Sequence, residues 1–197
     1  MTLPDDDALA EIRHELGNRF QRLYFWADQT GGKRSGQEDP VLKLSEELAG
    51  LQRYFGSALE YFTEPPLAVV EVPLADLVAR LRATLPERKL EVTGLDPLAS
   101  VGALVDPALL SRVLELVGSR VEAATPQGSV LFLAVRKGSR PKSVELELSG
   151  EPDGDAPSPV LSGIEAMVAR RWMVRHGGDL SEGSSQPASI IVTVPVD

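Results

Sequence analysis

Residues 41–62 have the sequence VLKLSEELAGLQRYFGSALEYF, in which apolar side chains recur at intervals of three and four. This is the spacing of one face of an α-helix and of the a and d positions of a helical seam. The residues that follow the spacing are Val41, Leu44, Leu48, Leu51, Phe55, Ala58 and Phe62. The pattern predicts a helix whose apolar face packs against other helices.

A second, less regular helical pattern precedes this stretch. Its apolar positions are Leu9, Ile12, Leu16, Leu23 and Trp26, and Arg19 interrupts them. Asp5 to Asp7 suit a helix start, and the polar, glycine-rich residues 30–40 indicate a loop. Residues 1–64 are therefore expected to form an antiparallel helical hairpin. Because both helices carry more apolar positions than one hairpin can cover, we expect a homodimer that forms a four-helix bundle.

Pro65 and Pro66 end the second helix and mark a domain boundary. The patterns that follow predict strands at 68–72, 89–93, 130–136, 143–148 and 189–196, and helices at 74–84, 107–124 and 164–175. Residues 150–159 are rich in Gly, Pro and Asp and indicate a loop. Residues 65–197 are thus expected to form an α/β sandwich, which gives the whole chain an α+β fold class.

Composition narrows the possible functions. The chain has 197 residues, is 43% hydrophobic and carries a net charge of −9, so it can build a core but is poorly suited to binding nucleic acid or anionic membranes. It has no cysteine and only two histidines, which argues against thiolate chemistry and multi-histidine zinc sites. The amino terminus is acidic and no apolar stretch is long enough to span a bilayer. We therefore expect a soluble, cytoplasmic protein.

The first helix carries a group of polar residues that could take part in a chemical reaction. With Leu9 at position a of the helical repeat, His14 falls at position f, on the solvent side. Asn18 lies one turn further along the same face, and Glu15 is adjacent to His14. An imidazole titrates near neutral pH and can attack phosphorus, while a neighbouring carboxylate can orient the ring or accept its proton. The spacing alone is equally compatible with an ordinary solvated helix face.

The segment Ile12-Arg13-His14-Glu15-Leu16-Gly17-Asn18 resembles the H-box of two-component histidine kinases, in which His-Glu-x-x-Asn opens the first helix of a dimeric hairpin. The order of elements after Pro66 also resembles the family's GHKL-type ATP-binding domain. The resemblance implies that residues 1–64 form the dimerisation and phosphotransfer domain and residues 65–197 an ATPase-like domain. It further implies that His14 is the phosphoacceptor of a bacterial signalling phosphoprotein.

The second domain departs from the family at its nucleotide contacts. The resemblance aligns Glu115 and Ser119 with the two magnesium-binding asparagines; serine offers no amide oxygen, and glutamate adds charge beside phosphates. Asp153 is a weak substitute for the adenine-binding aspartate, and only Gly163 remains of the Gly-x-Gly turn. His176 lies in a segment that matches the scaffold, where we expect a turn residue. We therefore expect no bound nucleotide, cofactor or metal of the chain's own.

Together these features lead us to expect a histidine phosphotransferase that resembles the kinase-like members of phosphorelays. It would relay a phosphoryl group between response-regulator receiver aspartates through His14, with Glu15 orienting the ring, Asn18 nearby and the divalent metal supplied by the receiver domain. Three alternatives remain open. They are a response-regulator phosphatase in which Asn18 aligns water, a non-catalytic dimeric pseudokinase scaffold, and an ATP-dependent histidine kinase.

Overall fold

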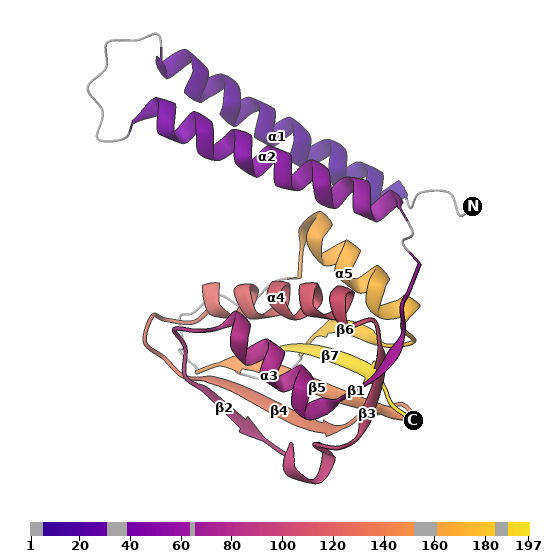
Figure 1. Ribbon diagram of the computed structural model, residues 1–197. Coiled ribbons are helices and arrows are strands. Elements are labelled where there is room, and N and C mark those ends of the chain that lie inside the picture. Colours follow the sequence, from indigo (N-terminus) through magenta and orange to yellow (C-terminus); the bar gives the residue numbers. More distant parts are fainter. Residues whose placement is uncertain (1–5, 31–38, 64–65, 152–160, 184–188) are drawn as a thin grey trace. The chain divides into compact units, whose positions relative to one another are not determined.

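The computed structural model of the chain describes residues 6–30, 39–63, 66–151, 161–183 and 189–197. The chain divides into two compact units, Met1–Glu64 with Gly163–Val168 and Pro65–Ser162 with Ala169–Asp197. The first contains a helical hairpin and the second an α/β sandwich (Figure 1). The predicted α+β fold class is confirmed. The expected loop at 31–38 and the substitute Asp153 lie outside the described residues.

The hairpin consists of α1 (Asp6–Thr30) and α2 (Pro40–Phe62), which run side by side in opposite directions (Figure 1). The start of α2 is set by Asp39, whose Oδ1 accepts a hydrogen bond from the N–H of Val41 at 3.0 Å. Pro40 follows in the first turn, where its missing N–H is not needed. No helix in the described part of the chain combines the length and the apolar character needed to cross a membrane.

The buried face of α2 is displaced from the predicted seam. Leu51 and Ala58 are buried as predicted, but their buried companions are Tyr54 and Tyr61. The predicted seam residues Val41, Leu48, Phe55 and Phe62 are exposed. The apolar stripe of α2 is wider than a single neighbouring helix can cover, so only part of it is buried within one chain. The large apolar side chains of the hairpin that remain exposed are Leu9, Phe20, Tyr24, Phe25, Val41, Leu42, Leu48, Phe55, Leu59 and Phe62.

The α/β sandwich is built on a mixed five-stranded sheet of order β2-β4-β5-β7-β6. Its strands are β2 (Leu90–Thr93), β4 (Leu131–Lys137), β5 (Ser143–Gly150), β6 (Asp179–Glu182) and β7 (Ser189–Pro195). β2 and β4 are parallel and the other neighbours are antiparallel. A separate antiparallel ribbon pairs β1 (Val70–Pro73) with β3 (Gly102–Val105).

The core of this domain lies between the sheet and its helices. The helices are α3 (Leu74–Thr84) and α4 (Pro107–Ala123), with the part of α5 (Gly163–Arg175) from Ala169 onward. α4 packs on both α3 and β5. Side chains alternate along β5, where Val144, Leu146 and Leu148 are buried while Glu145 and Glu147 lie on the opposite face. The buried side chains of α4 are Leu110, Val113, Leu114, Val117 and Val121.

Three short elements were not predicted from the sequence: β3, β6 and the single 3₁₀ turn η1 (Asp96–Leu98). β3 and β6 have four residues each, too few to show a clear alternation. β6 depends on the glycine pair before it. Gly177 has a φ of +80°, and a Cβ on Gly178 would lie 2.1 Å from the carbonyl oxygen of Thr193.

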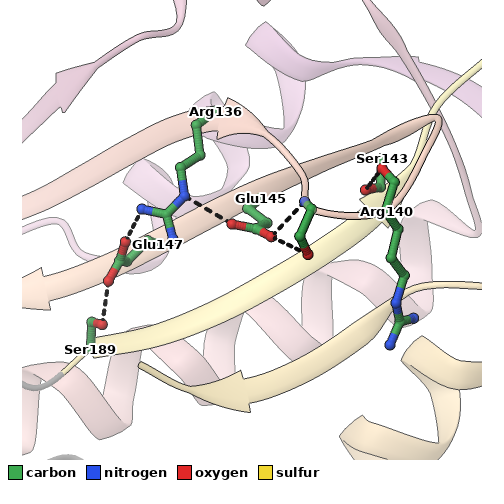
Figure 2. Close-up of polar contacts among 7 residues, drawn as sticks. Arg136, Arg140, Ser143, Glu145, Glu147 and Ser189 are labelled. Carbon is green, nitrogen blue, oxygen red and sulfur yellow. Dashed lines mark hydrogen bonds and ion pairs between the residues drawn. The ribbon is translucent and has the colours of Figure 1, made fainter. Parts of the chain in front are cut away.

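The face of the sheet away from the helices carries a ladder of charged side chains, shown in Figure 2. Arg136 on β4 contacts two glutamates of the neighbouring strand β5. Its Nε donates to Oε2 of Glu145 at 2.8 Å, and its guanidinium also pairs with Glu147. Glu147 accepts a hydrogen bond from the hydroxyl of Ser189 on β7 at 2.5 Å. The backbone N–H of Ser139 and the guanidinium of Arg136 hold the pKa of Glu145 below its usual value. The ladder joins three neighbouring strands and makes this face polar.

Candidate functional site

His14 lies on the exposed side of α1, and one ring nitrogen meets Asn18. The side chain is exposed, and its Nε2 is 3.2 Å from Nδ2 of Asn18 one helical turn away. An amide N–H can donate only to a ring nitrogen that carries no proton, so the contact is a hydrogen bond in the tautomer with its proton on Nδ1. The lone pair of Nε2, which is the nucleophilic position in that tautomer, is capped by the amide of Asn18.

Glu15 is directed elsewhere. Its Oε1 forms an ion pair with Arg19, 2.8 Å from Nε, and lies 3.6 Å from Nη2 of Arg22. Arg22 also pairs with Glu47 on α2, with Nε 3.2 Å from Oε2. The structure thus brings His14 and Asn18 together but places Glu15 in an ion-pair network that joins the two helices. The three residues predicted as one polar patch are divided between two groups of contacts.

Arg19 is the centre of that network, and the sequence pattern showed it only as an interruption of the apolar seam. Its guanidinium lies over the ring of Tyr54, 5.1 Å from the centroid. The hydroxyl of Tyr54 is buried, and among the described residues it has no hydrogen-bond partner. Burial and the negative charges of Glu15 and Glu11 raise the pKa of Tyr54 to about 12. The tyrosine therefore stays neutral at physiological pH.

Gly50 on α2 leaves room for the guanidinium of Arg19, which belongs to α1. A Cβ built on Gly50 would lie 3.0 Å from Nη1 of Arg19. The pairing of an arginine within one seam with a glycine on the facing helix was the available sequence signal. It could not be used without knowing how α1 and α2 align.

The positions aligned with the family's magnesium-binding asparagines do not fit a magnesium nucleotide. Ser119 is exposed, and its hydroxyl donates to the carbonyl of Leu116 at 2.9 Å, within its own helix. Glu115 is exposed on the same helix and offers a charged carboxylate in place of a neutral amide. Gly163 begins α5 with a φ of +81°, and Ser162 before it makes no side-chain cap. Across the described ranges, no group of three or more His, Cys, Asp or Glu side chains is placed to hold a metal ion.

His176 is a buried connection between two helices, a role more specific than the expected turn residue. It caps the C-terminal end of α5, where its Nδ1 donates to the carbonyl of Trp172 at 2.7 Å. Its Nε2 accepts from the backbone N–H of Asp106 at 2.9 Å. The sequence could not reveal this contact because the two residues are far apart in the chain.

Asp106 completes this connection at the start of α4. Its carboxylate accepts from the N–H groups of Ala108 at 3.0 Å, Leu109 at 3.2 Å and Ala68 at 2.9 Å. Burial opposes the charged form, but the three N–H donors outweigh burial and hold the pKa of Asp106 below its usual value. Asp106 and His176 thereby hold together the backbone at Ala68, the start of α4 and the end of α5. These contacts give both residues a structural role.

Comparison with known proteins identifies the fold of the chain. No protein-family model matches the chain, and no curated protein matches it. Among solved structures, the Acinetobacter baumannii histidine kinase AdeS is similar, with a TM-score of 0.64 and 16% identity over 93% of this chain and 97% of that chain. The mycobacterial sensor histidine kinase MprB has a TM-score of 0.48 and 17% identity over 66% of this chain and 98% of that one. The cytoplasmic segment of histidine kinase QseC has a TM-score of 0.46 and 17% identity over 82% of this chain and 95% of that one. By its similarity to AdeS, the chain has the fold of a histidine kinase, with a helical hairpin followed by an α/β sandwich.

Proposed function

We propose that the chain is a histidine phosphotransferase that relays a phosphoryl group between response-regulator receiver aspartates through His14, without binding ATP. The observation that carries the proposal is the exposed imidazole of His14 on α1, with a ring nitrogen held by Asn18. An exposed helix face is open to a docking receiver domain, and a neutral imidazole is a competent nucleophile toward phosphorus.

The proposed transfer is a direct displacement. The unprotonated nitrogen of His14 attacks the phosphorus of an aspartyl phosphate while the bond from phosphorus to the aspartate oxygen breaks, and the aspartate leaves as a carboxylate. The other ring nitrogen then gives its proton to water, which leaves a neutral phosphohistidine. Attack by the carboxylate of a second receiver reverses these events. The receiver domain supplies the divalent metal that neutralises the transferring oxygens.

Within this mechanism Asn18 and Glu15 have different roles. Asn18 contacts the ring at Nε2, so its amide must turn away before that nitrogen attacks. Glu15 is held by Arg19 and Arg22, which makes it a positioning residue for the first helix rather than the acceptor of the ring proton. The Glu15 network is expected to keep the His14 face of α1 in a fixed register against α2.

Independence from ATP is supported by the substitutions in the second domain. Ser119 uses its hydroxyl within α4, and Glu115 presents a negative charge where phosphates would approach. Titration of the purified chain with a fluorescent ATP analogue and magnesium should give no saturable signal. Saturable binding, lost on adding unlabelled ATP, would instead support an ATP-dependent histidine kinase.

The proposal includes a homodimer in the bacterial cytoplasm. Its support is the exposed apolar side of the hairpin, which includes Leu48 at 53% exposure and Leu59 at 65%. Exposed apolar surface of this extent is uncommon on a monomeric protein and is covered when two hairpins form a four-helix bundle. The proposed partners of the bundle are receiver domains of response regulators, with no nucleic acid or membrane involved.

A response-regulator phosphatase is the main alternative because the amide of Asn18 could align a water on the receiver's aspartyl phosphate. Like the transfer, hydrolysis needs the Asn18 amide to leave the ring of His14, and it differs from the transfer in that phosphate never resides on His14. A non-catalytic dimeric pseudokinase scaffold is the other alternative. It predicts that partner binding survives the loss of His14 with no loss of function.

The direct test uses a receiver carrying labelled phosphate, mixed with the wild-type chain, His14→Ala and Arg13→Ala. Arg13→Ala is a matched control because its exposed side chain lies beside His14. Transfer predicts acid-labile, base-stable label on the wild type and on Arg13→Ala but not on His14→Ala. Absence of label with faster loss of phosphate from the receiver would support the phosphatase, and absence of both would support the scaffold.

A further inference from the structure

A hollow of about 400 Å³ lies at the end of the α/β domain where β4 ends, β5 begins and β7 finishes. Small-molecule sites in proteins typically have volumes of about 300–1,000 Å³. The apolar part of its lining comes from η1, the residue before β3, the β4–β5 turn, β5 and the residue after β7. These apolar residues are Leu98, Val101, Pro141, Val144 and Val196.

The hollow lies far along the sheet from the degenerate nucleotide contacts. β5 begins beside it at Ser143 and runs away from it to Gly150. The segment that the family resemblance aligns with the adenine loop begins at Ser149, at the opposite end of the same strand. The hollow is therefore separate from the position at which a histidine kinase would bind ATP.

The rim of the hollow is basic, in a chain whose net charge is −9. Lys137, Arg140 and Lys142 line it, together with one acidic residue, Asp197. Arg140 is partly engaged, with Nη2 3.6 Å from Oδ2 of Asp179, and Figure 2 shows its guanidinium directed away from the Glu145 ladder. Within the described residues, neither Lys137 nor Lys142 has an ion pair, whereas Lys43 and Lys89 each pair with a glutamate. The two ammonium groups are thus available to an anion.

The turn that carries this rim is held in an unusual conformation. Lys142 has a φ of +54°, and it is the only non-glycine residue with positive φ in the described chain. Side chains other than glycine, asparagine and aspartate seldom occupy this region, and such strain is concentrated at functional sites. The turn is fixed by three contacts: the N–H of Gly138 to the carbonyl of Ser143 at 2.8 Å, the hydroxyl of Ser143 to the carbonyl of Arg140 at 2.7 Å, and the N–H of Val196 to the carbonyl of Lys142 at 2.9 Å. A rigid turn therefore presents the lysine.

We propose that this hollow binds a small amphipathic organic anion, with an apolar body on Leu98, Val101 and Val144 and a carboxylate between Lys137 and Lys142. An apolar floor with charged groups at one side is the usual construction of a small-molecule site. A nucleic acid would need an extended basic surface, whereas the basic side chains here are three around one hollow in a chain of net charge −9. The proposal is independent of the phosphotransfer chemistry at His14.

The test uses 4-(trifluoromethyl)benzoate and its neutral amide as probes, followed by ¹⁹F line broadening on the full chain. The informative variant is Lys137→Gln/Lys142→Gln, and the matched control is Lys43→Gln/Lys89→Gln, which removes the same charge from lysines outside the hollow. The benzoate should bind about tenfold more weakly to the informative variant than to the wild type, and within about twofold of the wild type for the control. The amide should bind more weakly than the benzoate.

Two further variants separate binding from folding. Lys142→Gly should relieve the positive φ and raise the thermal midpoint while weakening the benzoate, because the strain and the charge disappear together. Leu98→Gln should weaken the benzoate if the floor holds its ring. The proposal is overturned if the wild type does not broaden the benzoate signal at millimolar concentrations, if the amide binds equally well, or if the informative variant binds like the control.

Discussion

The amide nitrogen of Asn18 lies 3.2 Å from Nε2 of His14 on the exposed side of α1. This contact makes the candidate phosphoacceptor a capped nucleophile at rest, because the lone pair that would attack phosphorus accepts the amide N–H. The proposed reaction must begin with a rotation of the Asn18 side chain. In the described part of the chain no ion pair holds the imidazole, so the contact with Asn18 accounts for its orientation.

Removing the amide should therefore expose the nucleophile. In Asn18→Ala, the rate at which phosphoramidate phosphorylates His14 should rise by about two- to tenfold, since a hydrogen bond worth about 0.5–1.5 kcal/mol no longer has to be broken. The rate can be followed by ³¹P NMR of the phosphohistidine. Gln52→Ala on α2 removes an exposed amide elsewhere in the hairpin and should leave the rate unchanged. A slower reaction in Asn18→Ala would show that Asn18 assists the attack and does not restrain it.

A pair of glycine substitutions tests the Arg19 network. Gly56 has open space around it, so Gly56→Ala should raise the free energy of unfolding by about 0.8–1 kcal/mol through helix propensity. Gly50→Ala should gain less, because the new methyl group displaces the guanidinium of Arg19 from Tyr54 and Glu15. Urea unfolding measures both, and the difference should disappear in an Arg19→Ala background. Equal gains in the wild-type background would mean that Arg19 adjusts without cost.

Asp106 should make the stability of the α/β domain depend on pH in the acid range. Its folded pKa is depressed below the unfolded value of about 3.9, so its contribution is present above that pH and is lost as pH falls through the folded pKa. Asp106→Asn keeps a capping oxygen but should flatten the fall in unfolding free energy below about pH 4. Asp96→Asn, which removes an exposed carboxyl, is the control. Parallel acid profiles for wild type and Asp106→Asn would contradict this account.

The exposed side of the hairpin should mediate dimerisation. Phe55→Glu places a charge at a position that is 44% exposed in one chain and buried in the proposed bundle. Analytical ultracentrifugation should therefore find the wild type as a dimer and Phe55→Glu as a monomer. Gln127→Glu adds the same charge at an exposed polar position of the α/β domain and should remain dimeric. A monomeric wild type at micromolar concentration would remove the dimer from the proposal.

Much of the fold could be predicted because its signals are local. The α2 stripe, the Asp39 and Asp106 caps and the alternation along β5 each lie within one segment. The errors concern relations between segments. The choice of Tyr54 over Phe55 for burial depends on Arg19 of α1, and the pairing of β6 depends on Gly178 meeting Thr193 of β7.

The candidate site shows the same division between local and distant relations. The exposure of His14 and the position of Asn18 on its face follow from helical spacing. The direction of the Glu15 side chain does not follow from helical spacing, because it depends on Arg19 and Arg22, which also contact residues of α2. The turn at His176 could be predicted, but its contact with Asp106 could not, because Asp106 lies far along the chain. Long-range pairings of polar groups leave no periodic trace in a sequence.

The most direct test of the central claim is a two-stage relay. The chain is first loaded with labelled phosphate from one receiver, separated from that receiver and then mixed with a second, unlabelled receiver and magnesium. A relay through His14 predicts that label leaves His14 and appears on the aspartate of the second receiver, and that His14→Ala, which cannot be loaded, transfers none. Label that stays on the chain in the presence of every available receiver, or that leaves only as inorganic phosphate, would contradict a relay through His14.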